Sequence, residues 1–228
     1  MKIQMLPSSI DENGQASARQ HLLSLVIDDS VAIDAGCLAM ACSQMQRDNI
    51  RDIILTHTHL DHIAGLPVFI DDLFASLTEP LRIHATAEMI EILERDIFNW
   101  SIYPRFSELA NDHGPVVKYC EFERGSSIEV RHLSVRSIGV NHPVSANGYI
   151  VSDGKISIAI TGDTAETEEF WQACNSTPDL RAVFVECAFP DELVELALVS
   201  EHLTPGRLKT ELGKLTDRNY PVFVINIK

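Results

Sequence analysis

The sequence is poor in cysteine and in basic residues. Its five cysteines are odd in number and form no Cys-x-x-Cys pair, which predicts free, mostly buried thiols in a reducing compartment. Lys and Arg total 18 against 33 Asp and Glu, so the formal net charge is −15. Because no cluster of Lys or Arg is present, this charge argues against a long nucleic acid as the partner. A small anionic substrate stays compatible with it, since bound divalent ions would dominate the local field inside a site.

Long apolar runs are also missing, and the first residues do not have the pattern of a secretory signal. No stretch approaches the ~20 apolar residues of a membrane-spanning helix, and residues 1–7 lack the apolar core and cleavage site of a signal peptide. We therefore expect a cytoplasmic protein without a membrane partner. At 228 residues, with 45% hydrophobic and 22% charged residues, the composition is globular and predicts one domain over residues 1–228.

Short apolar runs bounded by turn residues alternate with stretches of helical periodicity, which predicts an α/β fold. The pairs Asp28-Asp29 and Asp153-Gly154 separate neighbouring apolar runs and indicate hairpins. Strands are predicted at residues 22–27, 30–33, 52–55, 81–84, 127–130, 133–138, 148–151, 156–160, 182–186 and 222–227. Helices are predicted at residues 38–47, 63–74, 87–97, 166–173 and 203–215.

Three histidines and an aspartate lie within six residues of the run THTHLDHIAG at 56–65. Residues two apart at a strand end point to the same side, so His57 and His59 are predicted to bind one cation together. Asp61 and His62 follow where the chain turns toward the next helix, and we expect them to bind a second cation. Imidazole and carboxylate ligands suit zinc, with manganese or iron as alternatives, and the absence of cysteine argues against a closed structural site. The run therefore predicts an open, catalytic centre with two divalent ions.

Two ions need more than these four ligands, and the later part of the chain offers three candidates near the ends of predicted strands. They are His142, Asp163 and His202. Alone, a histidine or aspartate at a turn is usually a capping or solvated group. Their occurrence together with the histidine run favours the metal interpretation.

The motifs THTHLDHIAG, NHP, TGDT and SEHLTP, in this order, resemble the successive metal motifs of the metallo-β-lactamase superfamily. The resemblance covers nearly the whole chain and implies a four-layer αββα sandwich with a two-metal site at one edge of its β layers. Asp34, in the turn Asp34-Ala35-Gly36, would orient ligands without touching metal. The resemblance also implies the metal ligands. The first ion would be bound by His57, His59 and His142, and the second by Asp61, His62 and His202. Asp163 would bridge the two ions.

Finer features favour one branch of that superfamily. Leu60 within the histidine run resembles the signature of class II cyclic-nucleotide phosphodiesterases. Residues 97–100 with 103–104, and residues 185–189, are similar to that group as well. The chain departs from the signature at Pro67 and Phe69. The resemblance implies a binuclear phosphodiesterase that hydrolyses a 3′,5′-cyclic nucleotide, cyclic AMP or cyclic GMP, to the 5′-monophosphate.

The expected mechanism uses a hydroxide that bridges two ions about 3.5–4 Å apart as the nucleophile. Asp61 would orient it while binding the second ion. The candidate proton donors to the leaving group are a metal-bound water and a nearby group such as Glu186 or Glu201. Phe98 and Trp100 are candidates to stack on the base. The alternative for these rings is that they close the core beneath a loop.

Other functions stay open on the same scaffold. A lactonase or thioesterase would use the same ligands on a carbonyl, whereas a tRNA 3′-processing nuclease resembles a protein with a basic RNA-docking arm that this acidic chain lacks. A non-catalytic nucleotide or metal sensor is the remote alternative, and the complete ligand set argues against it. Related enzymes are often dimers, so a homodimer is expected by analogy.

Overall fold

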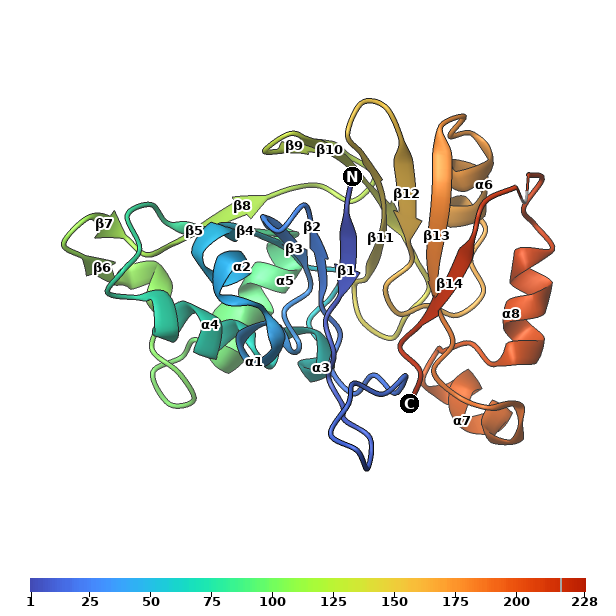
Figure 1. The fold of residues 1–228 in the computed structure, drawn as a ribbon, viewed down its shortest axis with the longest axis horizontal. Helices are drawn as coiled ribbons and strands as arrows, with labels where there is room; N and C mark the ends of the chain where they lie inside the picture. Colours follow the sequence, from blue (N-terminus) through green and yellow to red (C-terminus); the bar gives the residue numbers. More distant parts are fainter. Residues whose placement is uncertain (218) are drawn as a thin grey trace. The chain divides into compact units, whose positions relative to one another are not determined.

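The computed structural model describes residues 1–217 and 219–228 and divides into two compact units (Figure 1). The first unit comprises residues 1–17 and 21–123, and the second comprises residues 18–20 and 124–228. The short segment 18–20 thus belongs to the second unit although its neighbours in sequence belong to the first. Each unit contains one six-stranded sheet.

The sheet of the first unit is antiparallel at one edge and parallel over the rest. Its first three strands pair antiparallel, and the remaining pairs are parallel. The hairpin predicted at Asp28-Asp29 is confirmed, because both residues have positive φ, at 47° and 52°, and join two antiparallel strands. In order across the sheet, the strands are β1 (Ile3–Met5), β2 (Leu25–Ile27), β3 (Val31–Ile33), β4 (Asp52–Ile54), β5 (Leu81–Ala85) and β8 (Val117–Glu121).

Two helices predicted in the first unit are each divided in two. The helix predicted at 38–47 breaks before Ser43, whose hydroxyl accepts from the Gln46 backbone N–H while the Gln46 side chain accepts from the Ser43 N–H. This capping box starts a new helix there. The helix predicted at 63–74 divides at Gly65. The observed elements are α1 (Leu38–Ala41), α2 (Gln44–Asn49), α3 (Leu60–Ile63), α4 (Leu66–Leu73), α5 (Ala87–Ile92), the π-helical turn η1 (Leu93–Ile97), the 3-10 turn η2 (Phe106–Glu108) and the hairpin of β6 (Ala110–Asn111) and β7 (Gly114–Pro115).

Helices of the first unit pack on one face of its sheet. Alternate residues of each strand point to that face, and their apolar side chains form a core with the helices. The apolar core there includes residues from strands and helices alike: Val26, Ala32, Ile53 and Ile83 from strands, and Leu38, Leu66, Phe69 and Met89 from helices. Because this face is buried and apolar, polar side chains are expected at the ends of the strands.

The sheet of the second unit has antiparallel strands at one side and two parallel pairs at the other. The hairpin predicted at Asp153-Gly154 is confirmed, with Gly154 at φ 82° between two antiparallel strands. In order across the sheet, the strands are β14 (Val222–Ile225), β13 (Leu180–Glu186), β12 (Ser157–Ile160), β11 (Asn147–Ser152), β10 (Leu133–Gly139) and β9 (Ser127–Val130).

Helices α6 (Glu169–Asn175) and α8 (Pro205–Leu212) accompany this sheet (orange and red in Figure 1), and η3 (Asp191–Leu193) leads into α7 (Val194–Val199). Their core with the strands includes Ile150, Ala159, Val183, Phe170 and Leu208. Helix α7 and strands β1 and β8 were not predicted. Among the described residues, no helix combines the length and the apolar character needed to cross a membrane.

Candidate metal centre

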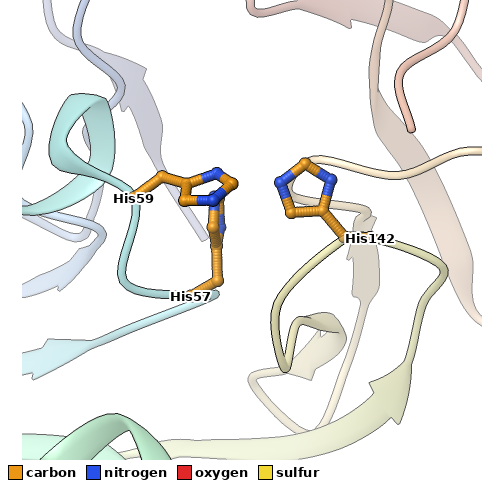
Figure 2. A group of neighbouring side chains, drawn as sticks. All are labelled: His57, His59 and His142. Carbon is orange, nitrogen blue, oxygen red and sulfur yellow. The ribbon is translucent and has the colours of Figure 1, made fainter. Parts of the chain in front are cut away.

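Four of the predicted ligands lie in the first unit, just beyond the carboxyl end of β4. His57 is fully buried and His59, which directly precedes α3, is half-buried. Their ring centroids are 4.7 Å apart with an edge-on arrangement, and Figure 2 shows the two rings close together on the segment that leaves the strand. The structure therefore brings together the two imidazoles that the spacing predicts to act together.

Helix α3 adds the other two ligands of this run. The buried His62 ring lies 4.1 Å from the His57 ring, centroid to centroid. The Asp61 carboxylate, on the first turn of the same helix, places Oδ2 3.9 Å from His62 Nε2. Three imidazoles and one carboxylate thus gather on one loop and one helical turn.

Asp34 holds the His62 imidazole in place. Its fully buried carboxylate accepts from the Thr56 N–H at 2.8 Å and from the Thr56 hydroxyl at 2.7 Å, and Oδ2 lies 2.7 Å from His62 Nδ1. A carboxylate can only accept here, so His62 carries its proton on Nδ1 and its ring lone pair on Nε2. This is the contact by which an acidic group orients a metal-binding histidine. The supporting role of Asp34 at a metal site stays a prediction.

Gly36 allows the turn after β3 to pack closely against helix α3. A Cβ at this position would lie 1.9 Å from the Asp61 backbone oxygen. That oxygen accepts from the Leu23 N–H at 2.8 Å, and the His62 oxygen accepts from the Ala35 N–H at 2.7 Å. Backbone hydrogen bonds therefore fix α3 against the turn, which only glycine permits at this distance.

The second unit brings its three predicted ligands together from distant parts of the sequence. His142, which is labelled in Figure 2, follows β10. Asp163 follows β12, and His202 precedes α8. One ligand atom from each lies within 4.8 Å of the others. Asp163 and His202 are buried, at 1% and 6% exposure, and His142 is half-buried. Two imidazoles and a carboxylate at this spacing fit a divalent cation.

Glu186, at the end of β13, anchors this group. Its fully buried carboxylate accepts backbone N–H groups of Thr164, Ala188 and Leu203 at 3.1, 2.9 and 3.2 Å, and Oε1 lies 2.9 Å from His202 Nδ1. Burial raises the pKa of this carboxyl, while the hydrogen bond with His202 opposes the rise. Since both oxygens already accept N–H groups, the geometry favours an orienting role over the proton-donor role considered for Glu186.

Glu201, the other proton-donor candidate, contacts the group through its backbone. Its carbonyl oxygen lies 3.3 Å from His142 Nδ1, and the residue has positive φ at 53°. The sequence pattern did not anticipate this contact, because a main-chain interaction leaves no signal in residue type.

Asn226 is a second contact that sequence reasoning missed. It follows β14, and its side-chain N–H₂ donates to Asp163 Oδ1 at 2.6 Å. Asparagine after a strand is an ordinary turn residue. Nothing in the local sequence therefore distinguishes it as part of a site.

The two aromatic candidates for stacking have different environments. Phe98 is fully buried in the apolar core, with its ring 5.8 Å from that of Phe106. It offers no exposed face, so the stacking role predicted for Phe98 is corrected to a core role. Trp100 is 57% exposed and stays a candidate.

Imidazole and carboxylate groups gather at the strand ends of this α/β fold. This set of donor atoms is typical of enzymes that use a divalent metal. The chain belongs to the β-lactamase superfamily, because the family model described as the beta-lactamase superfamily domain matches residues 30–215. Membership of this hydrolase superfamily, predicted from the motifs, is thereby confirmed. The fold implies divalent metal, and the donors described above are suited to it.

Two curated relatives carry the same kind of name. A protein of Yersinia pestis, named a probable 3′,5′-cyclic-nucleotide phosphodiesterase, is 24% identical over 209 residues, covering 80% of this chain and 58% of that protein. A 3′,5′-cyclic-nucleotide phosphodiesterase of Aliivibrio fischeri is 27% identical over 189 residues, covering 76% of this chain and 56% of that protein. The chain thus spans little more than half the length of these relatives.

Among solved structures, unliganded yeast PDE1 is similar to this chain with a TM-score of 0.78. The sequences are 18% identical, and the match covers 99% of this chain and 87% of that chain. Likeness at this identity concerns the fold. The predicted fold class, the α/β sandwich of the metallo-β-lactamase superfamily, is confirmed.

Proposed function

We propose that this chain is a metal-dependent phosphodiesterase that hydrolyses a 3′,5′-cyclic nucleotide, cyclic AMP or cyclic GMP, to the 5′-monophosphate. The observation that carries the proposal is the histidine run with Leu60, which resembles the phosphodiesterase signature, in a chain whose relatives bear that name. The acidic surface, with a net charge of −15, supports a small substrate over a long nucleic acid.

The proposed ligands follow the sequence motifs. We assign His57, His59 and His142 to one ion, Asp61, His62 and His202 to another, and Asp163 to both. Zinc is the proposed metal, with manganese or iron as alternatives. When bound, two such ions supply a water of lowered pKa and positive charge that offsets the charge on the phosphate.

The protein's own residues prepare this chemistry in three ways. Asp34 and Glu186 each accept from a histidine Nδ1–H, which directs the Nε2 lone pair of that ring toward a cation. The half-buried Asp61 accepts a hydrogen bond from the attacking water and orients it. Trp100 presents an exposed ring on which a base can stack.

The test is hydrolysis by the purified protein loaded with zinc, measured on cyclic AMP, cyclic GMP, an aryl phosphodiester, a lactone and a thioester. Turnover of a cyclic nucleotide that a chelator abolishes and added zinc restores would support the proposal. Turnover of the lactone or thioester alone would replace it with an acyl hydrolase. Zinc binding with no turnover on any of the five would favour the non-catalytic sensor. The cytoplasmic location, the single domain and the homodimer stay predictions from the sequence.

Replacing Trp100 with alanine should raise KM for the cyclic nucleotide. Base stacking on an aromatic ring contributes about 1–3 kcal/mol, which corresponds to a KM increase of roughly 5–150-fold. The backbone at this position is fixed, since the Trp100 main-chain N–H donates to the Tyr103 carbonyl oxygen at 2.9 Å. Steady-state kinetics measures the change, with kcat and zinc content expected to stay at the wild-type level.

The matched control for this variant is Ile102→Ala, which removes another exposed apolar side chain from the same loop, 67% exposed. Its KM should match the wild type. An unchanged KM in Trp100→Ala would exclude stacking by this ring.

A further inference from the structure

Asn226 touches a proposed metal ligand in a buried environment. Its side-chain nitrogen lies 2.6 Å from Asp163 Oδ1, and both residues are 1% exposed. An ionised carboxylate accepts only, so the amide must present its N–H₂ group and not its oxygen to Asp163. A short hydrogen bond to a charged acceptor, away from water, is among the stronger kinds in proteins.

The backbone of Asn226 is held in an uncommon conformation that aims the side chain at Asp163. The residue has φ 58°, in the left-handed region that asparagine tolerates better than most residues. Its N–H donates to the Gln20 side-chain oxygen at 2.6 Å, and the Gln20 N–H donates to the Ile227 oxygen at 2.7 Å. Gln20 is itself buried, at 4% exposure. Gln20 thus fixes the backbone here through two hydrogen bonds, one to the N–H of Asn226 and one to the carbonyl oxygen of Ile227.

These contacts restrict how Asp163 can present its oxygens. With Oδ1 held by the amide, the carboxylate cannot rotate about its side-chain bond without losing a buried hydrogen bond. Its other oxygen, Oδ2, lies 4.0 Å from Nδ1 of His202, another proposed ligand. The amide therefore selects one orientation of the carboxylate before any cation arrives.

We propose that Asn226 is a positioning residue for Asp163, and that Gln20 supports it, so that the pair sets the zinc affinity of this group. The inference rests on the proposed role of Asp163 as a metal ligand. Contacts that orient a ligand typically account for about 10–100-fold in metal affinity. The Asn226 side chain is uncharged. It therefore orients Asp163 without adding a charge that would itself attract the cation.

The experiment measures zinc binding by competition with a chromophoric chelator, using the full chain. We expect Asn226→Ala to lower the zinc affinity by about 10–100-fold. Gln20→Ala, which leaves Asn226 itself intact, should lower it less. The matched control is Asn111→Ala: this asparagine donates to the oxygens of Phe74 and Leu77 and contacts none of the proposed ligands. Its zinc affinity should equal the wild type's.

A double-mutant cycle with Asp163→Ala separates positioning from general damage. If Asn226 acts through Asp163, adding Asn226→Ala to Asp163→Ala should cause no further loss of zinc affinity. Additive losses, or wild-type affinity in both Asn226→Ala and Gln20→Ala, would overturn the proposal. Thermal unfolding of the zinc-free proteins confirms that each variant is folded.

The same measurements distinguish this inference from the proposed function. Zinc binding that Asn226→Ala weakens supports the positioning role even where no cyclic nucleotide is hydrolysed, in which case the substrate assignment alone fails. A wild-type chain that binds no zinc would overturn both.

Discussion

Asp61→Ala should lower kcat/KM for the hydrolysed ester by about 10²–10⁴-fold, the range for a group that handles the proton of the attacking water. The carboxylate stands on the first turn of α3, 3.9 Å from His62 Nε2, and its backbone oxygen is fixed by the Leu23 N–H at 2.8 Å. Truncation therefore removes both a proposed metal ligand and the proposed acceptor that orients water. Kinetics and zinc content of the same preparation measure the two losses together.

Asp61→Asn helps to separate these losses, because it keeps the side-chain volume and one oxygen ligand while removing the charge. We expect it to retain more zinc than Asp61→Ala and still lose most of the activity. Asp48→Ala is the matched control, since this aspartate on α2 accepts from the Gln44 side chain and contacts no proposed ligand. Wild-type kcat/KM in Asp61→Ala would exclude the role assigned to this carboxylate.

Glu186→Gln is expected to weaken zinc binding by about 10–100-fold, through loss of the group that orients His202. Both carboxylate oxygens of Glu186 accept N–H groups, whereas a glutamine amide has only one oxygen. Its NH₂ group would therefore face another donor, either the Ala188 N–H or the donors that contact Oε1, His202 Nδ1 among them. A buried donor left unsatisfied costs about 1–3 kcal/mol, so stability should fall as well. Zinc competition and thermal unfolding report the two effects.

Glu211→Gln is the control for that variant. Glu211 is as buried as Glu186, at 1% exposure, and accepts from Thr167 N and Trp171 Nε1, but it touches none of the proposed ligands. It should lose stability and keep its zinc affinity. Equal zinc affinities in the two variants would show that Glu186 acts only on the stability of the fold.

The local part of the candidate site could be predicted because its proposed ligands are close in sequence. His57, His59, Asp61 and His62 lie within six residues of one another, so residue type and spacing alone indicate a cation site. Every predicted strand overlaps an observed one, since alternating and continuous apolar runs reflect burial directly.

Contacts set by tertiary structure could not be predicted in this way. Phe98 and Trp100 stand two positions apart in the same aromatic stretch, yet one is buried in the core and the other is 57% exposed. The helix predicted at 38–47 has continuous helical periodicity, but the capping box at Ser43 restarts it. Such outcomes depend on neighbours that periodicity does not describe.

The hydrogen bond from Asn226 to Gln20 joins residues 206 positions apart in sequence, which bears on the order in which the chain folds. A contact of this separation forms only after the intervening chain has been synthesised, and contacts between distant residues form slowly. The histidines at 57–62, by contrast, are held by nearer parts of the chain, since the hydrogen bonds to this run and its helix come from residues 23–36 and the strand before it pairs with β5. We therefore expect a nascent chain to complete its histidine run early and to orient Asp163 only after residue 226 has been synthesised, so that a zinc ion captured during translation would meet the first unit's imidazoles first.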